Sequence, residues 1–362
     1  MQQQMKGYAG QPTAESTELI VCADPSVPIR SCNLERQKTF EPVEECKAKW
    51  YVNNSVGVSE ASAAAYFFAK RVHEALRIPV GVINVSWGGT PIEAWMSREV
   101  LEKEFAGEFN LEPLNTKVWP EKNAHKVPSV LYNGMLNTVA PFTAKGFLWY
   151  QGCDNRMRYE QYKRLQPAFV KMLRELWGNE KMPFYFTQIA PYKYGDPNRP
   201  EGGYMMWAQA QTLDLIPYSG MAATHDAGEF ACIHPANKKA VGDRLAYLAL
   251  QKDYGVKGFE ADPPVPVTFE FRDGAAIVTF KVGSKGVSPT GLDLPSFELA
   301  GEDKVFYPAT ARVSKDRKSI TVTSEQVPSP IAVRYGMKNW SEATLYNNYG
   351  IPVSPFRSDD WE

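Results

Sequence analysis

The sequence predicts an α/β protein, with a mostly parallel sheet covered by helices and a small antiparallel β module after it. Through residues 1–258, short apolar runs alternate with stretches of helical period, a pattern typical of a parallel sheet with helices on both faces. From about residue 259 the runs become short and alternating and are separated by Gly, Pro and Asp, which favours antiparallel strands. A chain of 362 residues is long enough for both parts.

The elements of the first part follow from their local patterns. Residues 1–50 are rich in polar and turn-forming types, and we expect them to be irregular. The spacing of apolar residues predicts helices over 59–78, 159–177, 204–215 and 235–253. Apolar runs bounded by turn residues predict strands over 80–85, 146–150, 184–189 and 221–224.

The second part shows a strand pattern only. Alternating runs predict strands over 267–271, 277–281, 319–323 and 331–335. The last residues, 339–362, are aromatic and rich in turn formers, and we expect them to pack back on the first part. The expected domains are therefore an α/β domain at 1–258, a small β module at 259–336 and a tail at 337–362.

Composition argues against several classes of protein. The formal net charge is −1, whereas a nucleic-acid or anionic membrane partner requires a concentrated basic face. No apolar run reaches the ~18–20 residues of a membrane span. The five cysteines are an odd number without metal-type spacing, and we expect free thiols; a disulfide among Cys22, Cys32 and Cys46 is the alternative.

The most informative phrase is V-G-V-I-N-V-S-W-G-G-T-P-I-E-A-W, at residues 80–95. An apolar strand pattern ends in Gly88-Gly89, and Pro91 stands at a favourable first position for a helix. A strand that ends in a Gly-Gly turn and starts a helix points backbone N–H groups into the crevice at the carboxyl edge of the sheet. Ligands bind there in open α/β sheets, so the phrase predicts a binding site.

Three loops are expected to leave this edge of the sheet together, over 86–90, 151–155 and 225–234. Gly88 and Gly89 offer backbone N–H donors where the lack of a Cβ permits close approach of a carbonyl oxygen. Asn155 offers an amide as a second donor for a developing oxyanion, and His234 a general base that could deprotonate a serine hydroxyl. The combination of the three predicts acyl transfer.

Each of these residues alone has a plainer interpretation, since a Gly-Gly pair or an Asn after a strand is commonly just a turn or a cap. His225, next to Asp226, is a rival base with an equally good structural role. Ser86 and Cys153 are alternative nucleophiles. Ser86 lacks the preceding glycine of a nucleophile elbow, and Cys153 would require His234 to lower its pKa.

Several motifs extend over nearly the whole chain. They are W-G-G-T-P-I-E-A-W at 87–95, L-Y-N-G-M at 131–135, W-Y-Q-G at 149–152 with Asn155, I-H-P at 233–235 with Lys238, Gly242, Arg244 and Leu245, L-Y-N at 345–347, S-P-F-R at 354–357 and D-D-W at 359–361. With these motifs the chain resembles the sialate O-acetylesterase family of the SGNH/GDSL hydrolases, which is related to acetylxylan esterases.

The resemblance implies a three-layer α/β/α, flavodoxin-like domain and removal of acetyl groups from sugar hydroxyls without a metal or cofactor. A serine attacks the acetyl carbonyl and His234 activates it, while Gly88 or Gly89 and Asn155 hold the oxyanion. The same loops contain the expected substrate-binding residues Trp87, Thr90, Gln151 and Cys153. The expected partner is an acetylated carbohydrate, and the family is mostly exported. The resemblance does not give the oligomeric state.

The chain departs from the family pattern at two places. The family serine belongs to a Gly-Gln-Ser-Asn-Met motif, a few residues before a segment that Lys6-Gly7-Tyr8 fits. We therefore expect the serine just upstream of Met1, after the N-terminal β region and secretion signal of relatives. Cys153 stands where relatives have a Glu, which is a candidate orienter of the histidine.

Position 231 is Ala rather than the Asp of many SGNH enzymes, so Asp226 or Glu229 would have to orient His234. The sequence therefore predicts a sialate-type O-acetylesterase. A noncatalytic, acetyl-glycan-binding remnant of the family and an acetylxylan-type esterase are the alternatives.

Overall fold

The computed structural model of the protein describes residues 2–8, 10–140, 142–283 and 285–361. The chain forms two compact units, each described here by itself. The first comprises Met1–Thr187, Gln211–Gly220 and Ala236–Ala246, and the second Gln188–Ala210, Met221–Pro235 and Tyr247–Glu362. Neither unit is a continuous segment, because the chain passes between them after residues 187, 210, 220, 235 and 246.

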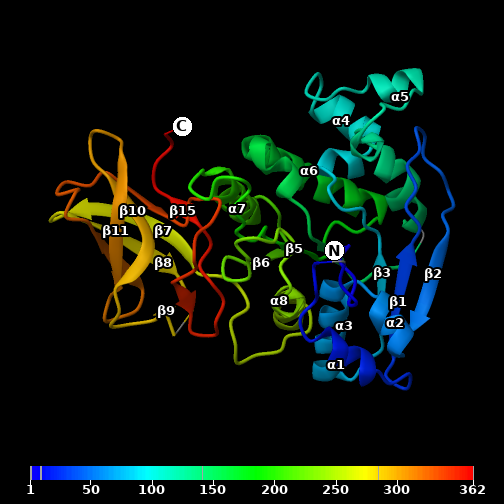
Figure 1. Ribbon diagram of the computed structural model, residues 1–362, viewed down its shortest axis with the longest axis horizontal. Helices are drawn as coiled ribbons and strands as arrows, with labels where there is room; N and C mark the ends of the chain where they lie inside the picture. The colour runs from blue at the N-terminus through cyan, green and yellow to red at the C-terminus, as the bar shows by residue number, and fades with distance from the viewer. Residues whose placement is uncertain (1, 9, 141, 284, 362) are drawn as a thin grey trace. The chain divides into compact units, whose positions relative to one another are not determined.

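A three-stranded sheet in the first unit has the order β2-β1-β3 (Figure 1). Strand β1 (Ile29–Leu34) pairs in parallel with β3 (Val80–Asn84) and antiparallel with β2 (Ala48–Val52). The predicted strand at 80–85 is therefore confirmed. The expectation that residues 1–50 are irregular is wrong, because they contain β1, most of β2 and helix α1 (Ser16–Val21).

The predicted helix at 59–78 is two helices, α2 (Ser55–Glu60) and α3 (Ala63–Leu76). The break has a physical cause in the N-terminal segment. Met5 N–H donates to the Ala61 carbonyl (2.9 Å), and Ala63 N–H donates to the Gln3 carbonyl (2.9 Å). Residues 3–5 thus take the backbone groups that a continuous helix would pair internally. Met5 is fully buried in the apolar cluster that contains Tyr66 and Phe67 of α3.

A second three-stranded sheet has the order β4-β5-β6. Strands β4 (Phe147–Trp149) and β5 (Phe184–Thr187) are parallel, and β6 (Ser219–Ala222) follows. Helix α6 (Tyr159–Leu176) packs on β4 through Trp149, whose ring centroid lies 4.5 Å from that of Phe169. These are the strands and the helix that the apolar runs predict. The protein is a mixed α/β structure. Two three-stranded sheets contain parallel strand pairs, in place of the one mostly parallel sheet that we expected, and a separate sheet is antiparallel.

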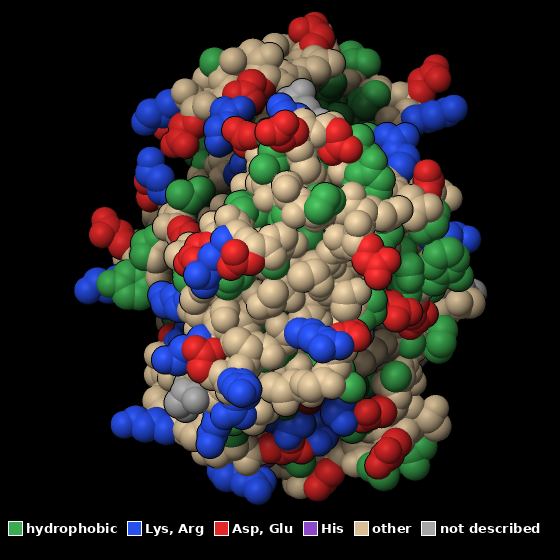
Figure 2. Space-filling view, turned by 90° about the vertical axis from the view of Figure 1, so that its left-hand side faces the viewer, with side chains coloured by type: hydrophobic (Ala, Val, Ile, Leu, Met, Phe, Trp, Pro, Cys, Tyr) green, Lys and Arg blue, Asp and Glu red, His purple; other side chains and the backbone are tan. Residues whose placement is uncertain are grey.

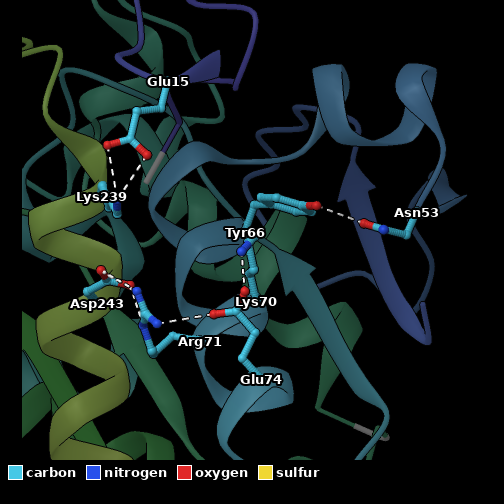
Figure 3. A network of polar contacts seen from close by, with 8 residues as sticks. All are labelled: Glu15, Asn53, Tyr66, Lys70, Arg71, Glu74, Lys239 and Asp243. Carbon is cyan, nitrogen blue, oxygen red and sulfur yellow. Dashed lines mark hydrogen bonds and ion pairs between the residues drawn. The ribbon is translucent and has the colours of Figure 1, made fainter. Parts of the chain in front are cut away.

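Helix α8 (Lys238–Lys252) packs against α3 through charged side chains in the first unit (Figure 3). The Arg71 guanidinium holds both carboxylate oxygens of Asp243, each at 3.1 Å. Lys239, one turn earlier on α8, pairs with Glu15 at 2.9 Å. Asp243 is buried, whereas the Lys239–Glu15 pair is exposed. Glu15 directly precedes α1, so this second pair joins α8 to the start of α1 and not to α3.

Short helices fill the connections of the first unit and its neighbouring segments. They are η1 (Ile92–Trp95), α4 (Arg98–Glu104), α5 (Glu112–Thr116), η2 (Ala124–Lys126), η3 (Tyr132–Leu136), η4 (Asn137–Val139), η5 (Cys153–Arg158) and η6 (Thr212–Asp214). Within the described part of the chain, no helix is both long enough and apolar enough to cross a membrane.

The second unit contains a seven-stranded antiparallel sheet with the order β15-β13-β10-β11-β12-β8-β7. Its strands are β7 (Val265–Arg272), β8 (Ala275–Lys281), β10 (Leu294–Ala300), β11 (Phe306–Val313), β12 (Ser319–Thr323), β13 (Ala332–Tyr335) and β15 (Phe356–Arg357); β9 (Val287–Ser288) pairs with β14 (Tyr346–Asn347). The face drawn in Figure 2 carries acidic and basic side chains interspersed rather than one field of a single sign.

The sequence did not predict β10 and β11, the two central strands. Each contains a proline, Pro295 and Pro308, and the β10–β11 pairing shifts register between Leu294 and Phe297. Proline within a run argues against a strand, and a bulge disturbs the alternation of apolar residues. The buried faces of these strands nevertheless supply Phe297 and Leu299 to the core of the sheet.

Helix α7 (Glu201–Gln211) of the second unit is in close contact with the chain that follows β13. Gly202 N–H donates to the Asn339 side-chain oxygen at 2.7 Å. A Cβ on Gly203 would lie 2.6 Å from the Met337 carbonyl carbon, so only glycine permits this approach. The residues after Tyr335 are therefore anchored on α7. The domain boundaries expected from the sequence remain a proposal.

Candidate active site

The loop after β3 is held by its own side chains. Thr90 Oγ1 donates to the Trp87 carbonyl at 2.7 Å and accepts from Trp95 Nε1 at 2.9 Å. Gly89 has φ +66°, which favours glycine at this position of the turn. The expected helix after Pro91 is only the 3₁₀ turn η1, because Pro91 is extended (φ −77°, ψ 160°). A turn, and not the N-terminus of an α-helix, therefore presents Gly88 and Gly89.

The N–H group of Gly88 donates to Oε1 of Gln2. This amide oxygen is an uncharged carbonyl acceptor, as the oxygen of an acetyl ester is. The segment that carries Gln2 is fixed by the hydrogen bonds of Gln3 and Met5 to Ala63 and Ala61. The start of the described chain thus lies against the Gly-Gly turn.

Asn155 is fully buried, and its amide has one orientation. Its Oδ1 accepts from the backbone N–H of Ile92 (2.9 Å) and from Gln151 Nε2 (2.6 Å), while its Nδ2 donates to Glu93 Oε2 (2.9 Å). A backbone N–H can only donate and a carboxylate can only accept, so a flipped amide would break both contacts. The Asn155 amide is therefore a preoriented donor with one further N–H.

Glu93 is the site residue that the sequence analysis missed. Its side chain is buried, accepts a hydrogen bond from the Asn155 amide and pairs with Arg158. Its backbone carbonyl accepts from Ser129 N–H at 2.9 Å. A signal for it was present, because a single carboxylate interrupts the apolar run P-I-E-A-W. Acidic residues are rarely buried without a specific partner.

Gln151 joins the first two predicted loops. Its Nε2 donates to the Thr90 carbonyl (3.1 Å) as well as to Asn155. Cys153 begins η5, and all five cysteines are free thiols. Its neighbour Asp154 pairs with Lys126 at 2.7 Å. The structure thus brings loops 86–90 and 151–155 together, although β3 and β4, which precede them, belong to separate sheets.

Trp87 is half-buried and stacks on His125, with ring centroids 5.2 Å apart and an interplanar angle of 7°. Burial lowers the pKa of His125, and the charges of Lys126, Lys38 and Arg36 lower it further against the opposing effect of Asp154. The ring of His125 is therefore kept largely neutral at pH 7.

The third predicted loop belongs to the second unit. His234 and Asp226 are exposed, and the Cys232 thiol donates to the His234 carbonyl at 3.3 Å. The rival base His225 is buried between Val353 O (3.2 Å from Nδ1) and Ser341 Oγ (2.8 Å from Nε2). Burial lowers the pKa of His225 to about 4. Both ring nitrogens of His225 are thus taken by structural partners.

Across the residues that the structure describes, no group of three or more His, Cys, Asp or Glu side chains is placed to hold a metal ion.

Comparison with known proteins shows the family of the chain. Residues 2–251 match the sequence profile of a carbohydrate esterase family, the sialic acid-specific acetylesterases. A solved carbohydrate acetylesterase from Xanthomonas citri superposes with a TM-score of 0.86 at 30% identity, over 96% of this chain and 77% of that one. The class of the protein is therefore that of the carbohydrate esterases, which are carboxylic ester hydrolases.

Within this class, the chain belongs to the sialic acid-specific acetylesterase family. The sialate O-acetylesterases of Homo sapiens and Pongo abelii are each 25% identical to it over 323 residues, and that of Mus musculus is 24% identical over 347. Each match covers 82% of this chain. The chain spans about 60% of the length of these curated relatives.

Proposed function

We propose that this protein is a sialate-type carbohydrate O-acetylesterase, which hydrolyses acetyl esters on sugar hydroxyls. The observation that carries the proposal is the preoriented Asn155 amide, held on three sides next to a Gly-Gly turn whose Gly88 N–H already binds a carbonyl-type oxygen. Fixed donors of this kind stabilise the oxyanion of a tetrahedral intermediate without reorganisation during the reaction.

In the proposed mechanism a serine Oγ attacks the acetyl carbonyl while His234 takes the serine proton. The carbonyl electron pair moves onto oxygen, where Asn155 Nδ2 and the N–H of Gly88 or Gly89 stabilise the negative charge. Collapse of this intermediate releases the sugar alcohol, which receives the proton from His234. Water then hydrolyses the acetyl-serine by the same steps and releases acetate.

The serine of the family motif is the proposed nucleophile, two positions ahead of Met1. The contact between Gln2 and Gly88 supports this assignment. That position lies three residues ahead of Gln2 in the chain, and an extended chain spans about 3.5 Å per residue, so the serine would lie within about 10 Å of Gln2. Ser86 donates to Asn84 Oδ1 at 2.8 Å, which favours a structural role for that hydroxyl.

Trp87, Thr90, Gln151 and Cys153 are the proposed substrate-binding residues, and Asp226 or Glu229 the acid that orients His234. The variants Asp226→Asn and Glu229→Gln distinguish the two carboxylates. Only the variant that removes the orienting carboxylate should lower kcat, and its KM should not change. His234→Ala should abolish turnover, whereas His73→Gln, in a histidine that contacts the Ile78 carbonyl (2.7 Å), should not.

The decisive test uses the chain with Gly-Gln-Ser-Asn added ahead of Met1 and measures acetate release from O-acetylated sialic acid. Removing one oxyanion donor costs ~10²–10³ in rate, so Asn155→Ala should lower kcat by that factor. Asn115→Ala, in an exposed asparagine that accepts from Arg98, is the matched control. Wild-type turnover in the folded Asn155→Ala protein would falsify the assignment.

One observation favours a second function. Cys153 occupies the position of a family carboxylate, and a thiol cannot supply the same fixed negative charge. A noncatalytic protein that binds acetylated glycans would keep the pocket without that charge. Cys153→Glu discriminates, since it should raise turnover if the carboxylate was lost from an enzyme. An acetylxylan-type esterase is recognised by turnover of acetylated xylan in place of sialate.

The finer fold follows from the same proposal. We propose that the parallel strands form the central layer of a three-layer α/β/α domain of the SGNH type. The packing of α3 on β1 and β3 and of α6 on β4 supports it. The proposed domains are 1–258, 259–336 and 337–362, and the proposed partner is an acetylated carbohydrate.

A further inference from the structure

The short turn η2 contacts both loops that carry the proposed oxyanion donors. The His125 ring stacks on Trp87, which directly precedes Gly88. The next residue, Lys126, pairs with Asp154, which directly precedes Asn155. Groups gathered around η2 therefore border the place where the acetyl ester would be held.

Two cations lie over aromatic rings beside this turn. The Arg36 guanidinium carbon is 5.8 Å from the centroid of Trp87, and Lys38 Nζ is 4.6 Å from that of Trp119. Both charges act on His125, so they lie near the stacked pair. Among the described residues, neither Arg36 nor Lys38 has a carboxylate within ion-pair distance. Lys126, in contrast, is compensated by Asp154.

This combination recognises a particular ligand chemistry. Flat aromatic faces pack against the C–H faces of a sugar ring, and Trp87 and His125 are only half-buried. A guanidinium binds a carboxylate through two parallel hydrogen bonds, and a lysine adds a point charge. Neutral acetylated sugars such as acetylated xylan have no carboxylate that could pair with Arg36 and Lys38.

We propose that Arg36, Lys38 and the Trp87–His125 pair form a specificity subsite that binds the carboxylate and one face of an anionic acetylated sugar. The inference rests on the proposed function, since it names what that site selects. Arg36 and Lys38 lie in the connection between β1 and β2, outside the motifs that carry the family resemblance.

The test compares O-acetylated sialic acid with its methyl ester, in which the carboxylate is masked and uncharged. The wild-type protein should prefer the acid in kcat/KM, and Arg36→Gln with Lys38→Gln should reduce that preference about tenfold or more, mainly through KM. Lys49→Gln is the control, because Lys49 makes the same kind of contact with Tyr51 (5.0 Å) on β2. It should retain the preference.

Ionic strength gives a second readout. The wild-type kcat/KM for the acid should fall as salt is added, because attraction between exposed charges is screened, and the methyl ester should respond little. In the double variant the two substrates should show the same salt dependence. An unchanged preference for the acid in the double variant, or a wild-type protein without any preference, overturns the subsite.

Failure of the subsite can be separated from failure of the esterase. Calorimetric binding of sialic acid and its methyl ester measures the same preference in a protein that releases no acetate. Titration of His125 by NMR is independent of any ligand. Because Arg36 and Lys38 lower the pKa of His125, the double variant should raise it, and an unchanged value would show that the cations do not face the ring.

Discussion

The orientation of the Asn155 amide depends on the buried carboxylate of Glu93. Glu93 accepts one N–H of the Asn155 amide, while Arg158 holds the other oxygen of Glu93. A carboxylate in this position offers no N–H that could oppose the amide, so the second N–H of Asn155 keeps one direction. Glu93 is therefore a positioning residue in the proposed mechanism.

We predict that Glu93→Gln lowers kcat on O-acetylated sialic acid roughly tenfold, less than the ~10²–10³ expected for removal of a donor. The glutamine amide can face Asn155 with either its oxygen or its nitrogen, so the donor loses its fixed direction. KM should change little, since ground-state binding is retained. Glu108→Gln, in an exposed pair with Arg164, is the control, and an equal effect of both variants would contradict the assignment.

His225 predicts a pH dependence of stability. Its pKa is about 4 in the folded protein, because it is buried, against about 6.5 when unfolded. Below pH 6.5 the unfolded state therefore takes up a proton that the folded state does not. The free energy of unfolding should fall by about 2 kcal/mol between pH 7 and pH 5 from this group alone.

Urea unfolding of the wild-type protein and of His225→Gln at both values of pH measures this contribution. The variant should be less stable at pH 7, because Ser341 and Val353 lose a well-fitted partner, but should lose less stability on acidification. Equal losses in the two proteins would mean that His225 does not titrate in this way.

Helix α8 makes two ion pairs that can be compared, Asp243 with Arg71 of α3 and Lys239 with Glu15 just ahead of α1 (Figure 3). Asp243→Asn should destabilise the protein by about 1–2 kcal/mol, because it weakens a two-pronged contact to Arg71 at a buried carboxylate. Glu15→Gln, which breaks the exposed pair with Lys239, should cost less than about 0.5 kcal/mol. Thermal denaturation of both variants measures which of them loses more stability. A larger loss of stability for Glu15→Gln would contradict the argument.

The elements that could be predicted from the sequence are those with one regular pattern of side chains, either apolar throughout or amphipathic. Strand β5 is buried at every position and reads as an apolar run, and α6 has a long amphipathic period. Strand β1 alternates apolar and polar types irregularly around Cys32, and β2 is mostly exposed. Strand β1 is stabilised by pairing with β3, and β2 by pairing with β1. No local sequence pattern records such pairing.

The same distinction holds for the candidate site. Loops 86–90 and 151–155 could be predicted as binding loops because each follows an apolar strand pattern, although β3 and β4 belong to two separate three-stranded sheets. Glu93, Gln2 and His125 could not, since their roles arise from contacts across 62, 86 and about 40 residues of sequence. Residue type suggested which groups could do acyl-transfer chemistry, but only the folded chain shows what orients them.

At the scale of the whole molecule, the two units share secondary structure. Strand β6 and helix α8 each continue across a boundary between the units, after residues 220 and 246. Loss of order in one unit therefore removes part of an element on which the other depends. Cooperative unfolding is expected where elements are shared in this way, in contrast to domains joined by a single linker.

We predict that both units lose structure at the same urea concentration. Hydrogen exchange followed by mass spectrometry checks this separately at β5 of the first unit and β12 of the second. Val333→Ala, which opens a cavity at a fully buried position of β13, should lower both midpoints together by an amount equivalent to about 1–2 kcal/mol. If β12 lost protection at a lower urea concentration than β5, the prediction would be wrong. The seven-stranded sheet would then unfold independently, and the shared elements would not couple the stabilities of the two units.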